Sequence, residues 1–266
     1  MRVALSEILS SRTLEGDTVT FIATSDWMQG RTMFGGFLSA LALVAIRDTM
    51  GLDIPLRALQ ANFVGPVAQG EVVYRTRLLR QGKNVMQVQC DIYSQDTLAG
   101  IVIGVFGAAR DSALPKYTPA CQPLPVSPEE ATEIPVIPRI TPNFIEHLNM
   151  RWALGGLPYS GTQGQRTGLY MQSKDKNLSN EVLVVLLSDG PPTPALSNFN
   201  GPVMASSVSW SLELPPLAEE NLEEGWFQID MEVDSIAEGY VHQTAKLWTP
   251  NGQLASLGYQ VVAVYG

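Results

Sequence analysis

The segment of residues 37–46, FLSALALVAI, places the strongest constraint on the fold, since it carries one hydroxyl and no charge. A helix formed by such a segment has no polar face to present to water, so other elements must surround it on every side. At roughly ten to fourteen residues it is too short to cross a bilayer. The segment therefore predicts a short helix that is buried in the protein, with a sheet curled around it.

Gly35 and Gly36 stand directly before this segment. Backbone N–H groups in the first turn of a helix lack intrahelical partners, and glycine leaves them open to approach. A helix start of this kind favours a negative oxygen, or an oxygen that becomes negative during a reaction. The sequence thus predicts an oxygen-binding site at Gly35 and Gly36, although Gly36 could also serve only to let the helix pack closely.

Strand-like segments follow the predicted helix. Residues 84–94 show the clearest alternation, with Met86, Val88, Cys90 and Ile92 on one face. The predicted strands of this half are residues 18–23, 56–63, 71–80, 84–94 and 99–109, with a hairpin turn at 81–83. A helix followed by an antiparallel meander indicates the α+β class.

A proline-rich segment, residues 113–142, divides the chain. It holds eight prolines in thirty residues, which favours extended, semi-rigid chain over regular strands. The predicted organisation is one domain over residues 1–112, a linker over 113–142 and a second domain over 143–266.

The second half repeats the plan of the first. A second apolar helix is expected over residues 178–187, and the segment Ser188-Asp189-Gly190-Pro191-Pro192 should end it. Strands are expected over residues 203–214, 226–235, 241–248 and 253–265, with Asn251-Gly252 as a hairpin turn. Helix then meander occurs twice, which indicates a structural duplication.

Charge and motifs exclude several classes of function. A formal net charge of −9, without a Lys/Arg run, argues against a nucleic-acid partner. Cys90 and Cys121 lack metal-type spacing, and we expect no metal site and no cofactor. The start of the chain lacks the apolar region of a signal peptide, and no apolar run reaches 18 residues, so we expect a cytoplasmic protein without membrane insertion. No Gly-x-Ser-x-Gly elbow or Gly-rich nucleotide loop is present.

Several motifs together resemble the type II acyl-CoA thioesterases. In the first half these are Phe34-Gly35-Gly36 and residues 59–66 leading into 79–83. In the second half they are Ser188-Asp189, residues 205–210, and residues 251–254 followed by Gln260. The sequence departs from the family pattern at Phe37, where the family usually has Gln, and at Gln81 and Lys83 of the hairpin. The resemblance covers nearly the whole chain.

The resemblance implies a double hot-dog fold, in which two central helices are each wrapped by an antiparallel sheet and the sheets join into one. It also implies a water molecule held by an Asp, a Ser or Thr, and a Gln, which by position are Asp189, Ser206 and Gln260. A carboxylate can take the proton of the attacking water, while a hydroxyl and an amide orient it. Alternatives stay open: Asp189 could be only a turn residue, and Ser207 could face the site in place of Ser206.

The expected function is hydrolysis of an acyl-CoA to a free acid and CoA, within lipid metabolism, with the acyl chain in an apolar tunnel between helices and sheet. One alternative is a non-catalytic protein of the same fold that binds acyl-CoA or an acyl group. Another is a structural partner in a larger assembly, with the uncharged sheet face as its interface. Paired units and sheet edges also predict a homo-oligomer.

Overall fold

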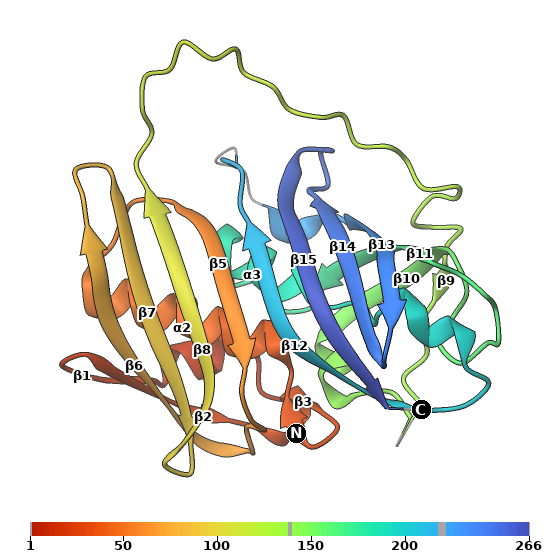
Figure 1. Cartoon of the computed structure of the whole chain (residues 1–266), viewed down its shortest axis with the longest axis horizontal. Helices are drawn as coiled ribbons and strands as arrows, with labels where there is room; N and C mark the ends of the chain where they lie inside the picture. The colour runs from red at the N-terminus through yellow and green to blue at the C-terminus, as the bar shows by residue number, and fades with distance from the viewer. Residues whose placement is uncertain (1, 138–139, 218–221, 266) are drawn as a thin grey trace.

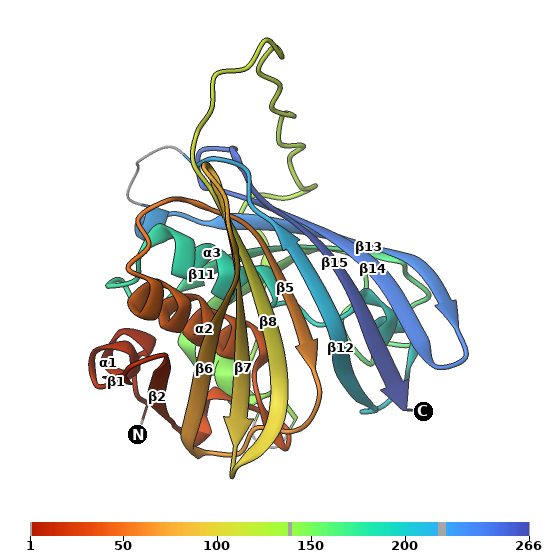
Figure 2. The same ribbon diagram turned by 60° about the vertical axis from the view of Figure 1, so that its left-hand side comes forward.

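One large antiparallel sheet and the two helices that it wraps dominate the fold (Figure 1). The computed structural model describes residues 2–137, 140–217 and 222–265. The wrapped helices are α2 (Gly35–Met50) and α3 (Asn180–Ser188). Within the described residues the sheet has thirteen strands, and its curvature around the helices is clearest in Figure 2.

The order of strands across the sheet is mirrored about its centre. On one side the order runs β2-β6-β7-β8-β5, and on the other β12-β15-β14-β13-β11, with β5 and β12 paired antiparallel in the middle. Along the chain the matching sets are β2-α2-β5-β6-β7-β8 and β11-α3-β12-β13-β14-β15. The two halves are therefore related by a pseudo-twofold arrangement, as the repeated plan of the sequence predicts.

The long strands have the following bounds: β2 (Thr18–Ala23), β5 (Leu56–Phe63), β6 (Gly70–Gln81), β7 (Val85–Ser94), β8 (Thr97–Gly107), β10 (Leu148–Leu154), β11 (Arg166–Ser173), β12 (Met204–Glu213), β13 (Phe227–Ala237), β14 (Tyr240–Trp248) and β15 (Leu254–Tyr265). Shorter elements are α1 (Leu5–Ser10), β1 (Thr13–Glu15), η1 (Ser25–Trp27), β3 (Met28–Gln29), β4 (Thr32–Met33), β9 (Thr132–Glu133), η2 (Asn143–His147), η3 (Pro194–Asn198) and η4 (Leu222–Glu224).

Helix α2 is buried along most of its length, as its sequence predicts. Ten of its sixteen residues are buried, and they include every position from Gly36 to Leu43. Gly51 caps the end of the helix, and its φ of 58° is a left-handed conformation that glycine adopts without a steric penalty. Ser179 caps the start of helix α3, and its side chain accepts a hydrogen bond from the backbone N–H of Val182. No helix among the described residues is long and apolar enough to cross a membrane.

The two helices lie side by side and run antiparallel. Near the end of α2, the Arg47 guanidinium donates to both carboxylate oxygens of Glu181 in the first turn of α3, each at 2.8 Å. At the other end, Gly36 in the first turn of α2 lies against the backbone of Leu186 near the end of α3. Each end of one helix thus meets the opposite end of the other.

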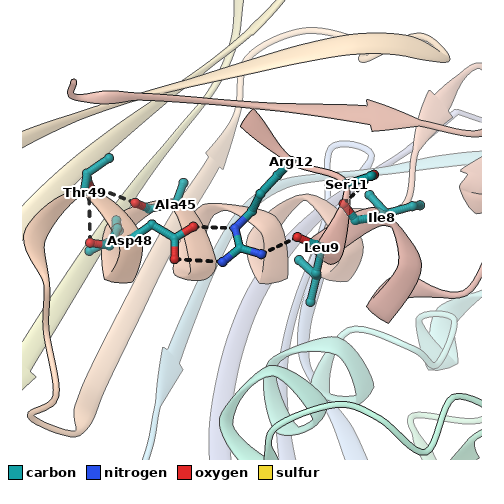
Figure 3. A network of polar contacts seen from close by, with 8 residues as sticks. Ile8, Leu9, Ser11, Arg12, Ala45, Asp48 and Thr49 are labelled. Carbon is teal, nitrogen blue, oxygen red and sulfur yellow. Dashed lines mark hydrogen bonds and ion pairs between the residues drawn. The ribbon is translucent and has the colours of Figure 1, made fainter. Parts of the chain in front are cut away.

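The N-terminal segment is fixed to α2 by Arg12 (Figure 3). The Arg12 guanidinium donates to both oxygens of Asp48 and to the backbone carbonyl of Leu9. Asp48 lies in the last turn of α2, so this contact attaches the chain after α1 to that helix. Beside it, the Thr49 hydroxyl donates to the carbonyl of Ala45 at 2.8 Å.

Aromatic rings join the two halves near the start of α2. The imidazole of His147 stacks on Trp27 with ring centroids 3.9 Å apart, and its Nε2 is 2.9 Å from Asp26 Oδ2. Phe144 stacks on Phe34 at the same centroid separation of 3.9 Å. Both His147 and Phe144 are buried, so η2 packs into the first half.

Most predicted strands are confirmed, and the longest strands that were not predicted lie at the start of the second half. The sequence analysis did not predict β10 and β11, which pair as an antiparallel hairpin within residues 143–173. Residues 108–131 contain no helix or strand and pass over one end of the sheet (Figures 1 and 2). Within the predicted linker, the two residues of β9 pair with β10 of the second half. Pro138 of the linker lies outside the described residues.

Candidate active site

Asp189 follows directly after the last residue of α3. It adopts φ −104° and ψ 1°, outside helical geometry, and Pro191 and Pro192 prevent the helix from continuing. Asp189 keeps part of its surface open to solvent, while the residue before it and the residue after it are buried. The end of the helix therefore places Asp189 beside the core, with part of the residue still reached by solvent.

Gln260 of β15 links Asp189 to a serine of the neighbouring strand. Its Nε2 donates to Asp189 Oδ1 at 2.8 Å and to Ser207 Oγ at 2.8 Å. Strands β12 and β15 pair antiparallel, with Trp210 opposite Gln260 and Ser207 opposite Val262. The structure thus brings together two of the predicted residues, Asp189 and Gln260, with Ser207.

Ser206 does not join this group. It is exposed on the other face of β12, and Ser207 takes the inward position. The cause is a register shift between Ser207 and Ser209. Strict alternation from the buried Trp210 and Leu212 would point Ser206 inward, but one extra residue in a strand reverses the face of everything beyond it. The structure therefore replaces Ser206 with Ser207.

The start of α2 encloses the carboxylate of Asp189. The backbone N–H of Gly36 donates to Asp189. A Cβ added to Gly35 would lie 2.7 Å from Asp189 Oδ2 and 2.9 Å from the Phe63 ring. Only glycine at this position therefore leaves enough space for the carboxylate. The oxygen that this helix start contacts in the structure belongs to Asp189, and binding of a substrate oxygen there stays a prediction.

Burial raises the pKa of Asp189 to about 7, against an ordinary value of 3.8. The hydrogen bonds from Gln260 and from the backbone of Gly36 act in the opposite direction, because they favour the charged form. No charged side chain of the described residues contributes to the shift. A carboxylate with a pKa near 7 can both accept and return a proton at neutral pH, which suits general acid–base catalysis.

A second amide, Gln243 of β14, supports Gln260 from the next strand. Its Nε2 donates to Gln260 Oε1 at 2.8 Å, and only 1% of the residue is exposed. The sequence analysis missed it. The signal was present, since alternation along β14 puts Gln243 on the same face as the buried Val241 and Leu247, where an apolar residue is expected.

An open pocket of about 640 Å³ lies further along the same face of the sheet. Val241 and Val264 form part of its wall, and they share the inward face of β14 and β15 with Gln243 and Gln260. Gln163, Gln165 and Asn198 supply polar groups, and no charged side chain lines it. Its size falls within the range of small-molecule sites.

Metal-binding groups do not gather within the described part of the chain: no three His, Cys, Asp or Glu side chains lie close enough to hold an ion. Cys90 is buried and Cys121 is partly buried, and both thiols are free. The chemistry that the site itself offers is that of a carboxylate, a hydroxyl and two amides.

Comparison with protein-family models gives two matches. Residues 23–107 match the model described as the acyl-CoA thioesterase N-terminal domain, and residues 121–264 match the acyl-CoA thioesterase C-terminal domain. No curated protein sequence matches the chain.

Solved structures share the fold over the full length. A conserved protein with a hot-dog fold from Alicyclobacillus acidocaldarius is 17% identical with a TM-score of 0.88, covering 100% of this chain and 99% of that one. An acyl-CoA thioesterase II from Mycobacterium marinum is 16% identical with a TM-score of 0.75, covering 98% of each chain. The TesB protein of Mycobacterium avium subsp. paratuberculosis is 16% identical with a TM-score of 0.80, covering 99% of this chain and 100% of that one.

Proposed function

Because the chain belongs to the acyl-CoA thioesterase family, we propose that it hydrolyses the thioester of an acyl-CoA to a free carboxylic acid and CoA. The observation that carries the proposal is the hydrogen-bonded group of Asp189, Gln260 and Ser207, with the Asp189 pKa near 7. This group offers a base of suitable strength at a partly open position.

In the proposed mechanism Asp189 accepts a proton from a water molecule as the water oxygen attacks the thioester carbon. The tetrahedral intermediate then expels the CoA sulfur, and Asp189 returns the proton to the leaving thiolate. The Ser207 oxygen already accepts a hydrogen bond from Gln260, so its own O–H remains to orient the water. Both Nε2 protons of Gln260 are used by Asp189 and Ser207, so we assign Gln260 to holding those groups and not the water.

We further propose that Gly35 and Gly36 contact the substrate at the start of α2. Gly36 already donates to Asp189, so its N–H serves the carboxylate first. The positive end of the helix would then stabilise the negative charge that passes from Asp189 to the thioester oxygen during attack.

The architecture that we propose is a double hot-dog, with domains over residues 1–112 and 143–266 and a linker over 113–142. The mirrored strand order and the two matched family models, over residues 23–107 and 121–264, support it. The cytoplasmic location, the role in lipid metabolism and the homo-oligomer stay predictions.

The second candidate is a non-catalytic protein that binds acyl-CoA or an acyl group. Phe37 favours it, since this buried ring stands where the family usually has Gln and stacks on Trp27 with centroids 4.9 Å apart. The amide that the family usually carries near the helix start is therefore replaced by an aromatic ring that packs in the core.

The deciding experiment measures release of free CoA from acyl-CoAs of graded chain length, with the wild type and Asp189→Asn. We expect turnover by the wild type and a loss of at least about 100-fold in the variant. Binding without turnover would support the non-catalytic candidate. Neither binding nor turnover, with a stable partner in pull-downs, would support the structural role.

A further inference from the structure

Three polar side chains from three adjacent elements form a directed chain of hydrogen bonds that ends at Asp189. Gln243 Nε2 donates to Gln260 Oε1, and Gln260 Nε2 donates to Asp189 Oδ1, each at 2.8 Å. Gln243 is on β14, Gln260 lies directly opposite it on β15, and Asp189 follows α3.

The direction of this chain is fixed by the carboxylate. An ionised carboxylate only accepts hydrogen bonds, so Gln260 must present its NH₂ group to Asp189. Its carbonyl then points toward Gln243, which must present an NH₂ group in turn. If Gln260 were reversed, its carbonyl would face the carboxylate and Ser207 would lose its donor.

The last group of the chain is left without a partner. Gln243 Oε1 is buried and accepts no hydrogen bond from the described residues. A buried acceptor without a donor costs stability, roughly 1–3 kcal/mol. A leucine at this position would avoid that cost, since Val241 and Leu247 on the same face are apolar. The glutamine is thus unfavourable for packing, and unfavourable groups of this kind are typical of functional sites.

We propose that Gln243 is a positioning residue, which holds the Gln260 amide in the one orientation that donates to both Asp189 and Ser207. The inference rests on the proposed function for its kinetic consequences, although its structural part stands apart from turnover. Without Gln243, the Gln260 carbonyl loses its donor, so the amide can rock about its last side-chain bond and its hydrogen bonds to the carboxylate and the hydroxyl weaken.

Removing the donor should change both rate and pH dependence. The hydrogen bond from Gln260 lowers the pKa of Asp189, so its loss raises that pKa further. In Gln243→Leu we expect kcat to fall about 10- to 100-fold, KM to stay within about twofold, and the acidic limb of the pH profile to move to higher pH. We expect no loss of thermal stability, because the unpartnered oxygen is removed as well.

Gln243→Glu supplies a sharper test at nearly equal side-chain volume. The introduced carboxyl can donate to Gln260 Oε1 only while it is protonated. Once it ionises, it attracts the Gln260 NH₂ group away from Asp189. We therefore expect a new alkaline limb, so that a profile that reaches a plateau in the wild type becomes bell-shaped.

The matched control is Gln228→Leu. Gln228 is also a buried glutamine of this sheet, on β13, but its Nε2 donates to the carbonyl of Gln122 and not to the site. We expect wild-type kinetics and pH profile in this variant. A wild-type pH profile of activity in Gln243→Leu would overturn the proposal. A loss of folded protein in Gln243→Leu that equals its loss of activity would also overturn it.

The NMR titration of the Asp189 carboxyl carbon separates this inference from the proposed function, since it needs no turnover. If the wild type shows no turnover but Gln243→Leu raises the pKa of Asp189, the positioning role is upheld and the thioesterase function is rejected. An unchanged Asp189 titration in an active protein would reject the positioning role alone.

Discussion

The Asp189 carboxyl decides the pH dependence of the proposed reaction. With its pKa at about 7, it is half protonated at neutral pH and a base only in its ionised form. We expect kcat/KM to rise about tenfold per pH unit below pH 7 and to reach a plateau above it. Steady-state kinetics between pH 5 and 9 would measure this, and a flat profile across pH 7 would argue against Asp189 as the base.

Ser206 and Ser207 form a natural pair of variants, since they are adjacent and lie on opposite faces of β12. Ser207→Ala removes the hydroxyl that Gln260 donates to, and we expect kcat to fall about 10- to 100-fold. Ser206→Ala changes only an exposed side chain and should keep wild-type activity. The same CoA-release assay applies to both. Equal effects of the two variants would contradict the assignment.

The sequence identifies the individual site residues to different extents. Asp189 and Gln260 come from the resemblance to a family. Gln260 also stands as a lone amide in the otherwise apolar segment of residues 257–264, where a buried polar group needs a partner. Ser206 fails because a one-residue register shift leaves no clear mark in the alternation of Ser206-Ser207-Val208-Ser209. The contact of Gly36 with Asp189 could not be foreseen, since it depends on how two helices far apart in sequence pack together.

At the scale of elements, the first turn of α2 is as important for packing as for chemistry. A Cβ on Gly36 would lie 2.6 Å from the Phe34 ring and 2.8 Å from the carbonyl oxygen of Leu186 in α3. The backbone contact cannot relax by a change of rotamer. We expect Gly36→Ala to lower the free energy of unfolding by about 1–3 kcal/mol through overpacking.

Denaturant unfolding of Gly36→Ala and Gly201→Ala would measure this cost. A Cβ on Gly201 would meet nothing within 4 Å, so that variant should unfold at the denaturant concentration of the wild type or at a slightly higher one. If both glycine variants unfolded alike, the close approach of α2 and α3 at Gly36 would not be limiting.

Elements with strong periodic patterns are predicted well, and those fixed by tertiary contacts are not. Helix α2 follows from its uniformly apolar sequence, and β7 from its alternation. Strands β10 and β11 were missed, because buried residues such as Thr167 and Gly168 of β11 give no clean alternation. The pairing of β9 within a proline-rich linker depends on its neighbour β10 and not on its own two residues.

At the scale of the whole molecule, His147 connects stability to pH across the two halves. Burial lowers the pKa of His147, an effect that Asp26 opposes and Arg2 reinforces. A folded-state pKa below that of the unfolded chain means that the unfolded state takes up the proton first. The stability that depends on neutral His147 is therefore complete above about pH 6.5, and it is lost as the pH falls through the pKa of His147 in the folded state.

Unfolding midpoints between pH 8 and 5 would measure this loss in the wild type and in His147→Gln. We expect the wild type to lose more stability on acidification than the variant, which lacks the titrating ring. Parallel curves for the two proteins would assign the acid sensitivity to other groups.

The antiparallel packing of α2 and α3 finally bears on stoichiometry. Under the pseudo-twofold arrangement, the place equivalent to Asp189 and Gly36 is the opposite end of the helix pair. Arg47 and Glu181 fill that place, and they also bond the backbone of Leu52, Ile54 and Leu56. The duplicated scaffold thus carries the proposed site of Asp189 at one end of the helix pair and an ion pair at the other. Calorimetric titration with a non-hydrolysable acyl-CoA thioether should therefore saturate at one ligand per chain, and saturation at two would show that the second end still binds.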